Sequence, residues 1–329
     1  MNKNKKTIGL VGLGYWGKNI ARNLYELGVL SAICDNDKNV LIHYKETYKG
    51  IKTYNNINEL LDSDIDAIFI ATPAATHFDL VKHTLNKGKH VFVEKPLCLN
   101  VSDGEYLKEI ADSKGLKLMV GHLLLYHPAF IALKDLLKSG GLGNIRYIYS
   151  NRLSLGKLRK EENALWSFAP HDISMILSLI GAEPKNIEAS GGYYLSKDVA
   201  DTTITVMTFE NNIKAHVFVS WLHPFKEQRL IVIGDKAMAS FVDVVEKEEK
   251  LLLYNHDIAW NGDVPIIEKV EGVPIKYDMS KEPLKEECLS FIRWIEEGVS
   301  PPSDAAEGIR VLKVLDNAEK ELKRKKLND

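Results

Sequence analysis

From Thr7 to about Gly121 the chain alternates between short apolar runs and longer amphipathic segments, and this order restricts the possible folds strongly. The apolar runs are TIGLVGLG, VLSAICD, DAIFIAT, HVFVEKP and LKLMVGH. The segments between them, such as 16–27, 77–87 and 103–114, have helical spacing and a polar face. A repeated strand–helix–strand order requires parallel strands joined by right-handed crossovers. Residues 1–122 are therefore predicted to form a doubly wound parallel sheet.

After Pro128 the pattern changes to β-like runs that follow one another without helices between them. They are NIEASGGYYLS, DTTITVMTFE, IKAHVFVSWLH, RLIVIGDKAMASFV and KLLLYN. Consecutive strands joined by short turns pair antiparallel. The helices expected in this half span 129–138, 171–180, 284–297 and 305–324. Residues 123–329 are therefore predicted to form a second α/β domain with a mostly antiparallel open sheet, which binds substrate and forms oligomer contacts.

The composition argues against several classes of protein. A formal net charge of −2 gives no bias toward nucleic acid or an anionic membrane surface. The cysteines, Cys34, Cys98 and Cys288, are odd in number and lack metal-ligand spacing, so neither a metal site nor a disulfide framework is expected. No run of about 18 apolar residues occurs, so no membrane span is expected. We expect a cytoplasmic protein that binds no nucleic acid and no membrane.

A glycine motif, Gly12-x-Gly14-x-x-Gly17, follows the first strand and opens the first helix. A second strand ends in Asp35, twenty-three positions after Gly12. In a dinucleotide-binding Rossmann fold the three glycines permit a tight turn, close approach to the pyrophosphate and close helix packing. The alternative is that they only form a turn. With the strand, the helix and the distal acid in place, the motif predicts a dinucleotide site that also includes Tyr15 and Trp16.

The acid at the end of the second strand bears on the choice of cofactor. The carboxylate of Asp35 can bind ribose hydroxyls but repels a 2′-phosphate, which favours NAD over NADP, although Lys38 follows closely. Thr72 and Pro73 end the next apolar run, where small residues would let the cofactor cross the sheet edge. His77 is either a further contact or an ordinary residue of the following helix.

In the segment KHVFVEKPLCL, an apolar strand is followed directly by Glu94, Lys95 and Pro96. The strand would end at the sheet edge where ligands bind. Pro96 keeps Lys95 out of the helical conformation. Lys95 would then direct its ammonium at a substrate hydroxyl, with Glu94 holding charge nearby. A surface ion pair at a strand end is the alternative.

The motifs GLGYWG, ICD, ATPAATH, GKHVFVEKPL and a later HDIS, taken in this order, resemble the Gfo/Idh/MocA family of sugar and inositol dehydrogenases. The resemblance implies a Rossmann domain, a C-terminal α/β domain with an open sheet, and hydride transfer between nicotinamide and a carbon-bound hydroxyl. It also implies that Lys95 is the family's active-site lysine and that His171 is its catalytic histidine.

His171 is chemically suited to its implied role, because an imidazole accepts a proton near neutrality. Lys95 would relay that proton or stabilise the developing alkoxide. Asp172 would orient the imidazole or the helix start, unless Pro170, His171 and Asp172 only cap a helix. Many inositol and glucose dehydrogenases of the family have an aspartate where this chain has Ser167, so a simple inositol dehydrogenase is disfavoured.

The candidate substrate contacts lie in GHLLLYHPAF, SNRLSLGKLRK and LWSFAPHDIS. His122 and Tyr126 follow the last Rossmann strand and are expected to face the substrate, although Tyr126 is equally consistent with a core residue. Asn151 and Arg152, with Lys157, Arg159 and Lys160 nearby, would pair with a diphosphate, unless the cluster is a solvated loop. Trp166 would cover a sugar face. Lys95, His171 and Asp172 are also expected to contact the substrate.

These features predict an NAD-dependent oxidoreductase that oxidises a secondary hydroxyl, at C3, of a nucleotide-activated sugar such as UDP-N-acetylglucosamine or its uronate. Such a step would serve the synthesis of cell-surface polysaccharide or lipopolysaccharide. The alternatives are a 3-ketoreductase of a sugar nucleotide, an inositol or free-sugar dehydrogenase, and a non-catalytic NAD-binding regulator. The apolar strands of the second domain, and the resemblance, predict a homodimer or homotetramer.

Overall fold

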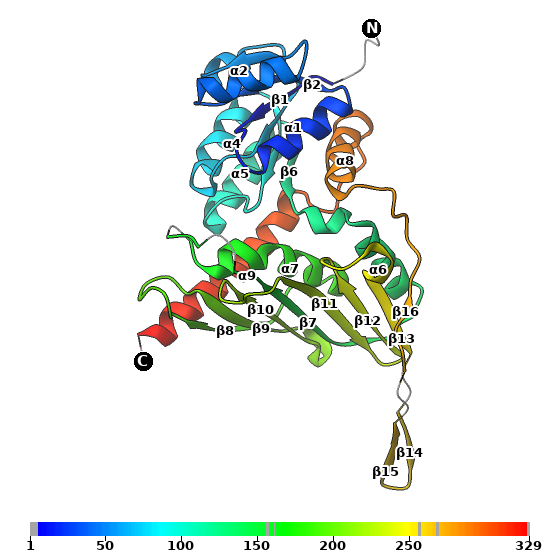
Figure 1. Ribbon diagram of the computed structural model, residues 1–329. Helices are drawn as coiled ribbons and strands as arrows, with labels where there is room; N and C mark the ends of the chain where they lie inside the picture. Colours follow the sequence, from blue (N-terminus) through cyan, green and yellow to red (C-terminus); the bar gives the residue numbers. More distant parts are fainter. Residues whose placement is uncertain (1–5, 156–157, 161, 256–257, 268–269, 328–329) are drawn as a thin grey trace. The chain divides into compact units, whose positions relative to one another are not determined.

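A computed structural model of the chain describes residues 6–155, 158–160, 162–255, 258–267 and 270–327. The chain divides into two compact units (Figure 1). The first unit comprises Met1–Leu123 with Glu282–Leu312, and the second comprises Leu124–Lys281 with Lys313–Asp329. None of the described helices is both long and apolar enough to cross a membrane.

The first unit contains a six-stranded, all-parallel sheet in the order β3-β2-β1-β4-β5-β6. The strands are β1 Ile8–Val11, β2 Leu30–Cys34, β3 Lys52–Tyr54, β4 Ala67–Ile70, β5 His90–Glu94 and β6 Leu118–Gly121. The strand order reverses between β1 and β4, which is the switch point where such sheets bind ligands. The four residues of β1 and the four of β4 are all buried, as expected for strands covered on both faces.

Helices connect these strands through crossovers. They are α1 Gly17–Glu26, α2 Lys38–Thr47, α3 Ile57–Leu61, the 3₁₀ turn η1 Ala74–Thr76, α4 His77–Asn86 and α5 Val101–Ser113. Asp37 caps α2 and Asn56 caps α3, each by accepting a hydrogen bond from the backbone N–H two residues further on. The prediction missed β3, because three residues are too few to show a period.

A helix from near the C-terminus, α8 Pro283–Glu297, also belongs to the first unit. Phe291 of α8 packs edge-on against Phe69 and Phe92 of the parallel sheet, with ring centroids 5.3 and 6.0 Å apart. Glu282, just before α8, forms an ion pair with Arg22 of α1. The predicted domains placed all of 123–329 together, whereas the compact units assign 282–312 to the first unit, because α8 covers an apolar face of its sheet.

The second unit contains an eight-stranded sheet in the order β16-β13-β12-β11-β7-β10-β9-β8. Its strands are β7 Ile145–Leu153, β8 Asn186–Gly192, β9 Thr202–Thr208, β10 Lys214–Ser220, β11 Glu227–Gly234, β12 Ala237–Val242, β13 Leu251–Asn255 and β16 Val273–Pro274. Every pair is antiparallel except β7 with β10. The predicted fold class, a Rossmann sheet plus a mostly antiparallel α/β domain, is confirmed.

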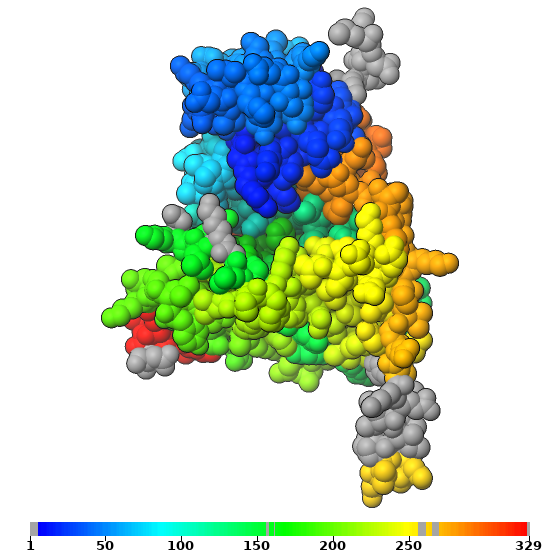
Figure 2. Space-filling model, in the orientation of Figure 1, coloured from blue at the N-terminus to red at the C-terminus, as the bar shows by residue number. Residues whose placement is uncertain are grey.

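Helices α6 Pro128–Lys138 and α7 Ala164–Ile180 cover one face of this second sheet (Figure 1). The 3₁₀ turn η2 Leu123–Tyr126 precedes α6, and α9 Ala305–Lys326 contributes its later part to the unit. The hairpin of β14 Ile258–Asn261 and β15 Val264–Ile267 projects from the sheet in the space-filling view (Figure 2). Helix α7 begins seven residues before the predicted start at 171, since Asn163 caps it and Pro170 lies inside it.

Candidate active site

The glycine loop between β1 and α1 has the shape that the motif predicts. Gly12 has φ +88°, and a Cβ there would lie 2.7 Å from the Ala71 carbonyl oxygen. A Cβ on Gly17 would lie 2.0 Å from the carbonyl oxygen of Gly12, so only glycine allows this packing. A Cβ on Gly14 would meet nothing within 4 Å. The loop is therefore tight at its two ends and open at Gly14, where a pyrophosphate could approach the helix N-terminus.

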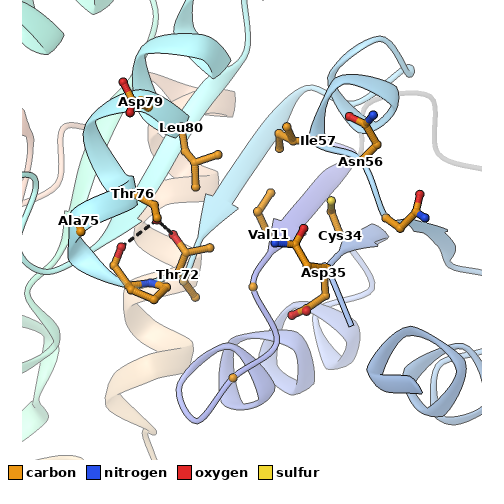
Figure 3. Close-up of a pocket in the computed structure, with 16 residues that line it drawn as sticks. Val11, Cys34, Asp35, Asn56, Ile57, Thr72, Ala75, Thr76, Asp79 and Leu80 are labelled. Carbon is orange, nitrogen blue, oxygen red and sulfur yellow. Dashed lines mark hydrogen bonds between the residues drawn. The ribbon is translucent and has the colours of Figure 1, made fainter. Parts of the chain in front are cut away.

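A cavity of about 780 Å³ lies at the carboxyl edge of the parallel sheet, and its volume suits a cofactor (Figure 3). The predicted cofactor residues Gly12, Gly14, Asp35, Thr72 and Pro73 all line it. Its other lining residues are Val11, Cys34, Asn36, Asn55, Asn56, Ile57, Ala71, Ala75, Thr76, Asp79 and Leu80. The residues present thus fit a dinucleotide.

Asp35, which lines this cavity, is held in place by hydrogen bonds from the backbone. Its Oδ2 accepts a hydrogen bond from the N–H of Leu13 at 2.8 Å, and its Oδ1 accepts one from the N–H of Asp37 at 3.0 Å. Each carboxylate oxygen has a second lone pair that remains available for a ribose hydroxyl. The bond to Leu13 also ties the acid to the glycine loop, so the two predicted parts of the nucleotide site are mechanically joined.

The loop after β4 forms the opposite wall. The hydroxyls of Thr72 and Thr76 lie 2.7 Å apart, and Thr76 donates to the carbonyl of Pro73 at 2.8 Å (Figure 3). His77 instead is buried, with Nδ1 2.7 Å from the Pro96 carbonyl oxygen and Nε2 2.9 Å from that of Thr72. Burial lowers the pKa of His77. Its ring therefore joins the cavity wall to the segment that carries Lys95.

Of the other residues predicted at the cofactor, Tyr15 is 84% exposed, with the Lys18 ammonium 5.2 Å from its ring centroid. Trp16 is half-buried, and its side chain forms a hydrogen bond with the Glu94 carboxyl. The glycine loop is thus linked to the end of β5. Tyr15 and Trp16 do not line the cavity of the first unit, and their cofactor contacts stay a prediction.

Glu94 and Lys95 differ sharply in exposure. Lys95 is half-buried and precedes Pro96 through a cis peptide bond, whereas Glu94 is only 5% exposed. Burial raises the pKa of Glu94 to about 8, although the Lys95 charge, the Lys95 backbone N–H and the Trp16 side chain all act to lower it. Burial, and then the charge of Glu94, also raise the pKa of Glu287 in α8 well above its usual range. Burial therefore favours the uncharged forms of Glu94 and Glu287, contrary to the expectation that Glu94 holds charge beside Lys95.

His122, predicted to contact substrate, is buried at the end of β6. Its Nδ1 lies 2.5 Å from Oε2 of Glu307, in the part of α9 that belongs to the first unit. Tyr126 is also buried, at 4% exposure, in the second unit. Neither position identifies a substrate contact, so both assignments stay predictions.

In the second unit, His171 lies within α7 and is half-buried. Asp172 is 1% exposed and forms a buried ion pair with Arg152 of β7. Arg152 Nε donates to Asp172 Oδ2 at 2.6 Å and Arg152 Nη2 donates to Oδ1 at 3.3 Å. Ser150 Oγ donates to Asp172 Oδ1 at 2.5 Å. Asp172 thus binds β7, and Arg152, predicted to bind a diphosphate, is held by a carboxylate.

The remaining predicted contacts of the second unit are less buried than this ion pair. Trp166 is half-buried on α7, and Asn151 donates to Oε1 of Glu227 at 3.1 Å. Arg159 pairs with Glu162 at 3.1 Å, and Lys157 lies outside the described residues. Their roles toward substrate stay predictions.

Several cavity residues were not anticipated from the sequence. Asn55 and Asn56 follow β3, and Asp79 lies in the first turn of α4. The pair of asparagines before an apolar helical segment was a usable signal of a strand end and a helix cap.

Two ranges of the chain match models of known protein families. Residues 6–122 match the model of an oxidoreductase family with an NAD-binding Rossmann fold, and residues 130–240 match the GFO/IDH/MocA C-terminal domain. Together the two matches span more than half of the chain.

Individual relatives match along nearly the full length. UDP-N-acetylglucosamine 3-dehydrogenase of Acidithiobacillus ferrooxidans is 27% identical over 306 residues, covering 92% of this chain and 93% of the relative. Its solved structure has a TM-score of 0.85 at 24% identity, covering 97% of each chain. Myo-inositol 2-dehydrogenase of Thermotoga maritima is 26% identical over 336 residues, covering 97% of each.

Proposed function

Since the chain belongs to the Gfo/Idh/MocA family of NAD-binding oxidoreductases, we propose that it oxidises the C3 hydroxyl of a nucleotide-activated sugar such as UDP-N-acetylglucosamine or its uronate. The family assignment makes the chain a dehydrogenase that acts on CH–OH groups with NAD as cofactor. The observation that carries the substrate proposal is the similarity to a UDP-N-acetylglucosamine 3-dehydrogenase over 92% of the chain. Such a product would enter cell-surface polysaccharide or lipopolysaccharide synthesis.

The chemistry assigned to this chain is proton removal and charge stabilisation at a single hydroxyl. His171 accepts the hydroxyl proton, and the ammonium of Lys95 stabilises the developing alkoxide or relays the proton. Bound NAD supplies the hydride acceptor. Burial favours the uncharged forms of Glu94 and Glu287, and an uncharged Glu94 leaves the positive charge of Lys95 available to the alkoxide. His122, Tyr126, Asn151 and Trp166 are proposed as sugar or nucleotide contacts.

An inositol dehydrogenase is the second candidate, because a myo-inositol 2-dehydrogenase is 26% identical over 97% of this chain. The family's usual aspartate four positions before the catalytic histidine is replaced here by Ser167. A serine hydroxyl cannot supply the negative charge that a carboxylate places beside the lysine and histidine. We therefore rank the sugar nucleotide first.

A turnover assay tests the function directly. Protein and NAD are mixed with UDP- and dTDP-hexoses, free hexoses and inositols, and NADH absorbance is followed with a carbonyl trap present. We expect turnover on one sugar nucleotide, reduced by about 10²–10⁴-fold in Lys95→Ala and His171→Ala. The exposed-residue variants Lys87→Ala and His43→Ala are the matched controls. Turnover on inositol alone would establish the second candidate, and NAD binding without turnover in either direction would indicate a regulator.

We also propose that a second copy of this chain packs on the sheet face opposite α6 and α7. Tyr147 and Tyr149 of β7 group there with His216 of β10, and the His216 ring stacks on Tyr149 at 5.5 Å. Ile204 of β9, on the same face, is 44% exposed. Such an apolar face favours a symmetric interface. Analytical ultracentrifugation of Ile204→Asp would show a smaller species if the face is an interface, and an unchanged mass if it is not.

A further inference from the structure

The buried network of Ser150, Arg152 and Asp172 has no part in the chemistry just proposed, yet Asp172 directly follows the proposed base in the chain. Side chains alternate along β7, so Ser150 and Arg152 point to the same covered face of the sheet, toward α7. There the carboxylate of Asp172 accepts hydrogen bonds from both of them. All three residues are at most 7% exposed.

The helix is weakened by its own sequence just before this point. Pro170 has no N–H, so the Trp166 carbonyl loses its helical partner and the backbone before His171 loses one constraint. Asp172 lies two residues after the proline, and its hydrogen bonds join α7 to β7 there. They restrict the position of the helix next to His171. A buried pair of this geometry holds both side chains in one arrangement.

We propose that Arg152, Asp172 and Ser150 are positioning residues that hold His171 at its working position, and that Arg152 acts through Asp172 and not as a ligand of the substrate's diphosphate. This inference rests on the proposed function, in which His171 is the base. Displacing a base by about 1 Å costs on the order of 10²-fold in rate. The network therefore affects kcat, while the binding of NAD by the other unit stays unchanged.

The first test compares kcat and KM in Arg152→Gln, Asp172→Asn and the double variant, which removes both charges together. We expect each single variant to lower kcat at least tenfold and to leave the KM for NAD unchanged. The double variant should have a kcat no lower than that of either single variant, because the residues act as a unit. Arg146→Gln is the matched control, because Arg146 also lies on β7 and pairs with an aspartate, Asp235, but is exposed. A kcat within twofold of wild type overturns the proposal. So does a loss confined to the KM for the sugar nucleotide in Arg152→Gln, which would make Arg152 a direct ligand.

Two further measurements separate this inference from folding and from the substrate assignment. Ser150→Ala keeps both charges, and we expect a two- to fivefold loss of kcat; if the charge variants do not fold, a wild-type kcat in Ser150→Ala overturns the proposal. NMR of histidine-labelled protein, with the His171 signal assigned by His171→Gln, needs no turnover. A His171 signal that shifts in Ser150→Ala but not in Arg146→Gln supports positioning even if no sugar nucleotide is oxidised. An unmoved signal overturns positioning.

Discussion

Glu94 and Asp172 each lie next to a proposed catalytic residue, and each is almost completely buried. The desolvation of Asp172 is offset by two hydrogen bonds from Arg152 and one from Ser150. Glu94 has the Trp16 side chain and the Lys95 backbone N–H as donors, and burial still raises its pKa to about 8. The same physical problem therefore has two solutions, which are an ion pair at Asp172 and protonation at Glu94.

The difference has a consequence for stability. A buried ion pair becomes an uncompensated charge when one partner is removed, whereas a neutral acid can be replaced by its amide with little electrostatic change. We therefore expect the stability of the second unit to fall strongly on single substitutions at Asp172. We expect the stability of the first unit to depend on pH through Glu94.

The largest effect is expected from Asp172→Ala, which leaves the guanidinium of Arg152 buried without its carboxylate. We expect the free energy of unfolding to fall by about 3–5 kcal/mol, measured by urea denaturation at pH 7. The variant Glu94→Gln, measured in parallel, should lose far less. Equal losses in the two variants would contradict the contrast.

The second prediction concerns the pH dependence of stability. The folded pKa of Glu94 is raised to about 8 from an ordinary value of 4.5, so between these values the folded state binds a proton that the unfolded state has released. Stability due to this group is therefore complete below pH 4.5 and decreases as the pH rises toward 8. From pH 6 to 8 the loss is roughly 2 kcal/mol, by the relation between pKa and free energy.

The variant Glu94→Gln removes this titration, so its unfolding free energy should change less between pH 6 and pH 8 than that of the wild type. Glu287, whose pKa burial also raises, contributes in the same direction. A matched Glu109→Gln variant, at an exposed position of α5, should keep the wild-type slope. Parallel curves for wild type and Glu94→Gln would mean that Glu94 is ionised in the folded protein.

The features of the fold and of the site that depend on local sequence patterns could be predicted from the sequence. The glycine motif and the parallel sheet follow from residues close together in sequence, and Asp35 follows from the characteristic spacing between that motif and the end of the second strand. The partner of Asp172 did not, because Arg152 is twenty positions away and its selection depends on how α7 lies on β7. Glu287 was also missed, because an acid in an amphipathic helix normally faces solvent and no local signal places α8 on the first sheet.

A third acid, Asp35, extends the comparison to a half-exposed position with backbone donors. The variant Asp35→Ser keeps an acceptor but removes the charge that repels a 2′-phosphate. We expect the Kd for NAD to rise roughly tenfold, about 1.4 kcal/mol, and the Kd for NADP to fall. Isothermal titration with both cofactors measures this, and Asp37→Ser is the neighbouring control. If the preference for NAD over NADP does not change, the nearby Lys38 and not Asp35 would determine the cofactor specificity.

The smallest effect separates burial from ion pairing itself. Arg146 and Arg152 lie on the same strand and each pairs with an aspartate, but the Arg146 side chain is 67% exposed and its contact with Asp235 is 3.5 Å long. Arg146→Gln should change the free energy of unfolding by about 0–1 kcal/mol, because solvent screens an exposed pair and already hydrates both partners. Urea denaturation in low and high salt measures it. A loss as large as that of Asp172→Ala would show that ion pairing by β7, and not the burial of Asp172, sets the stability of this sheet.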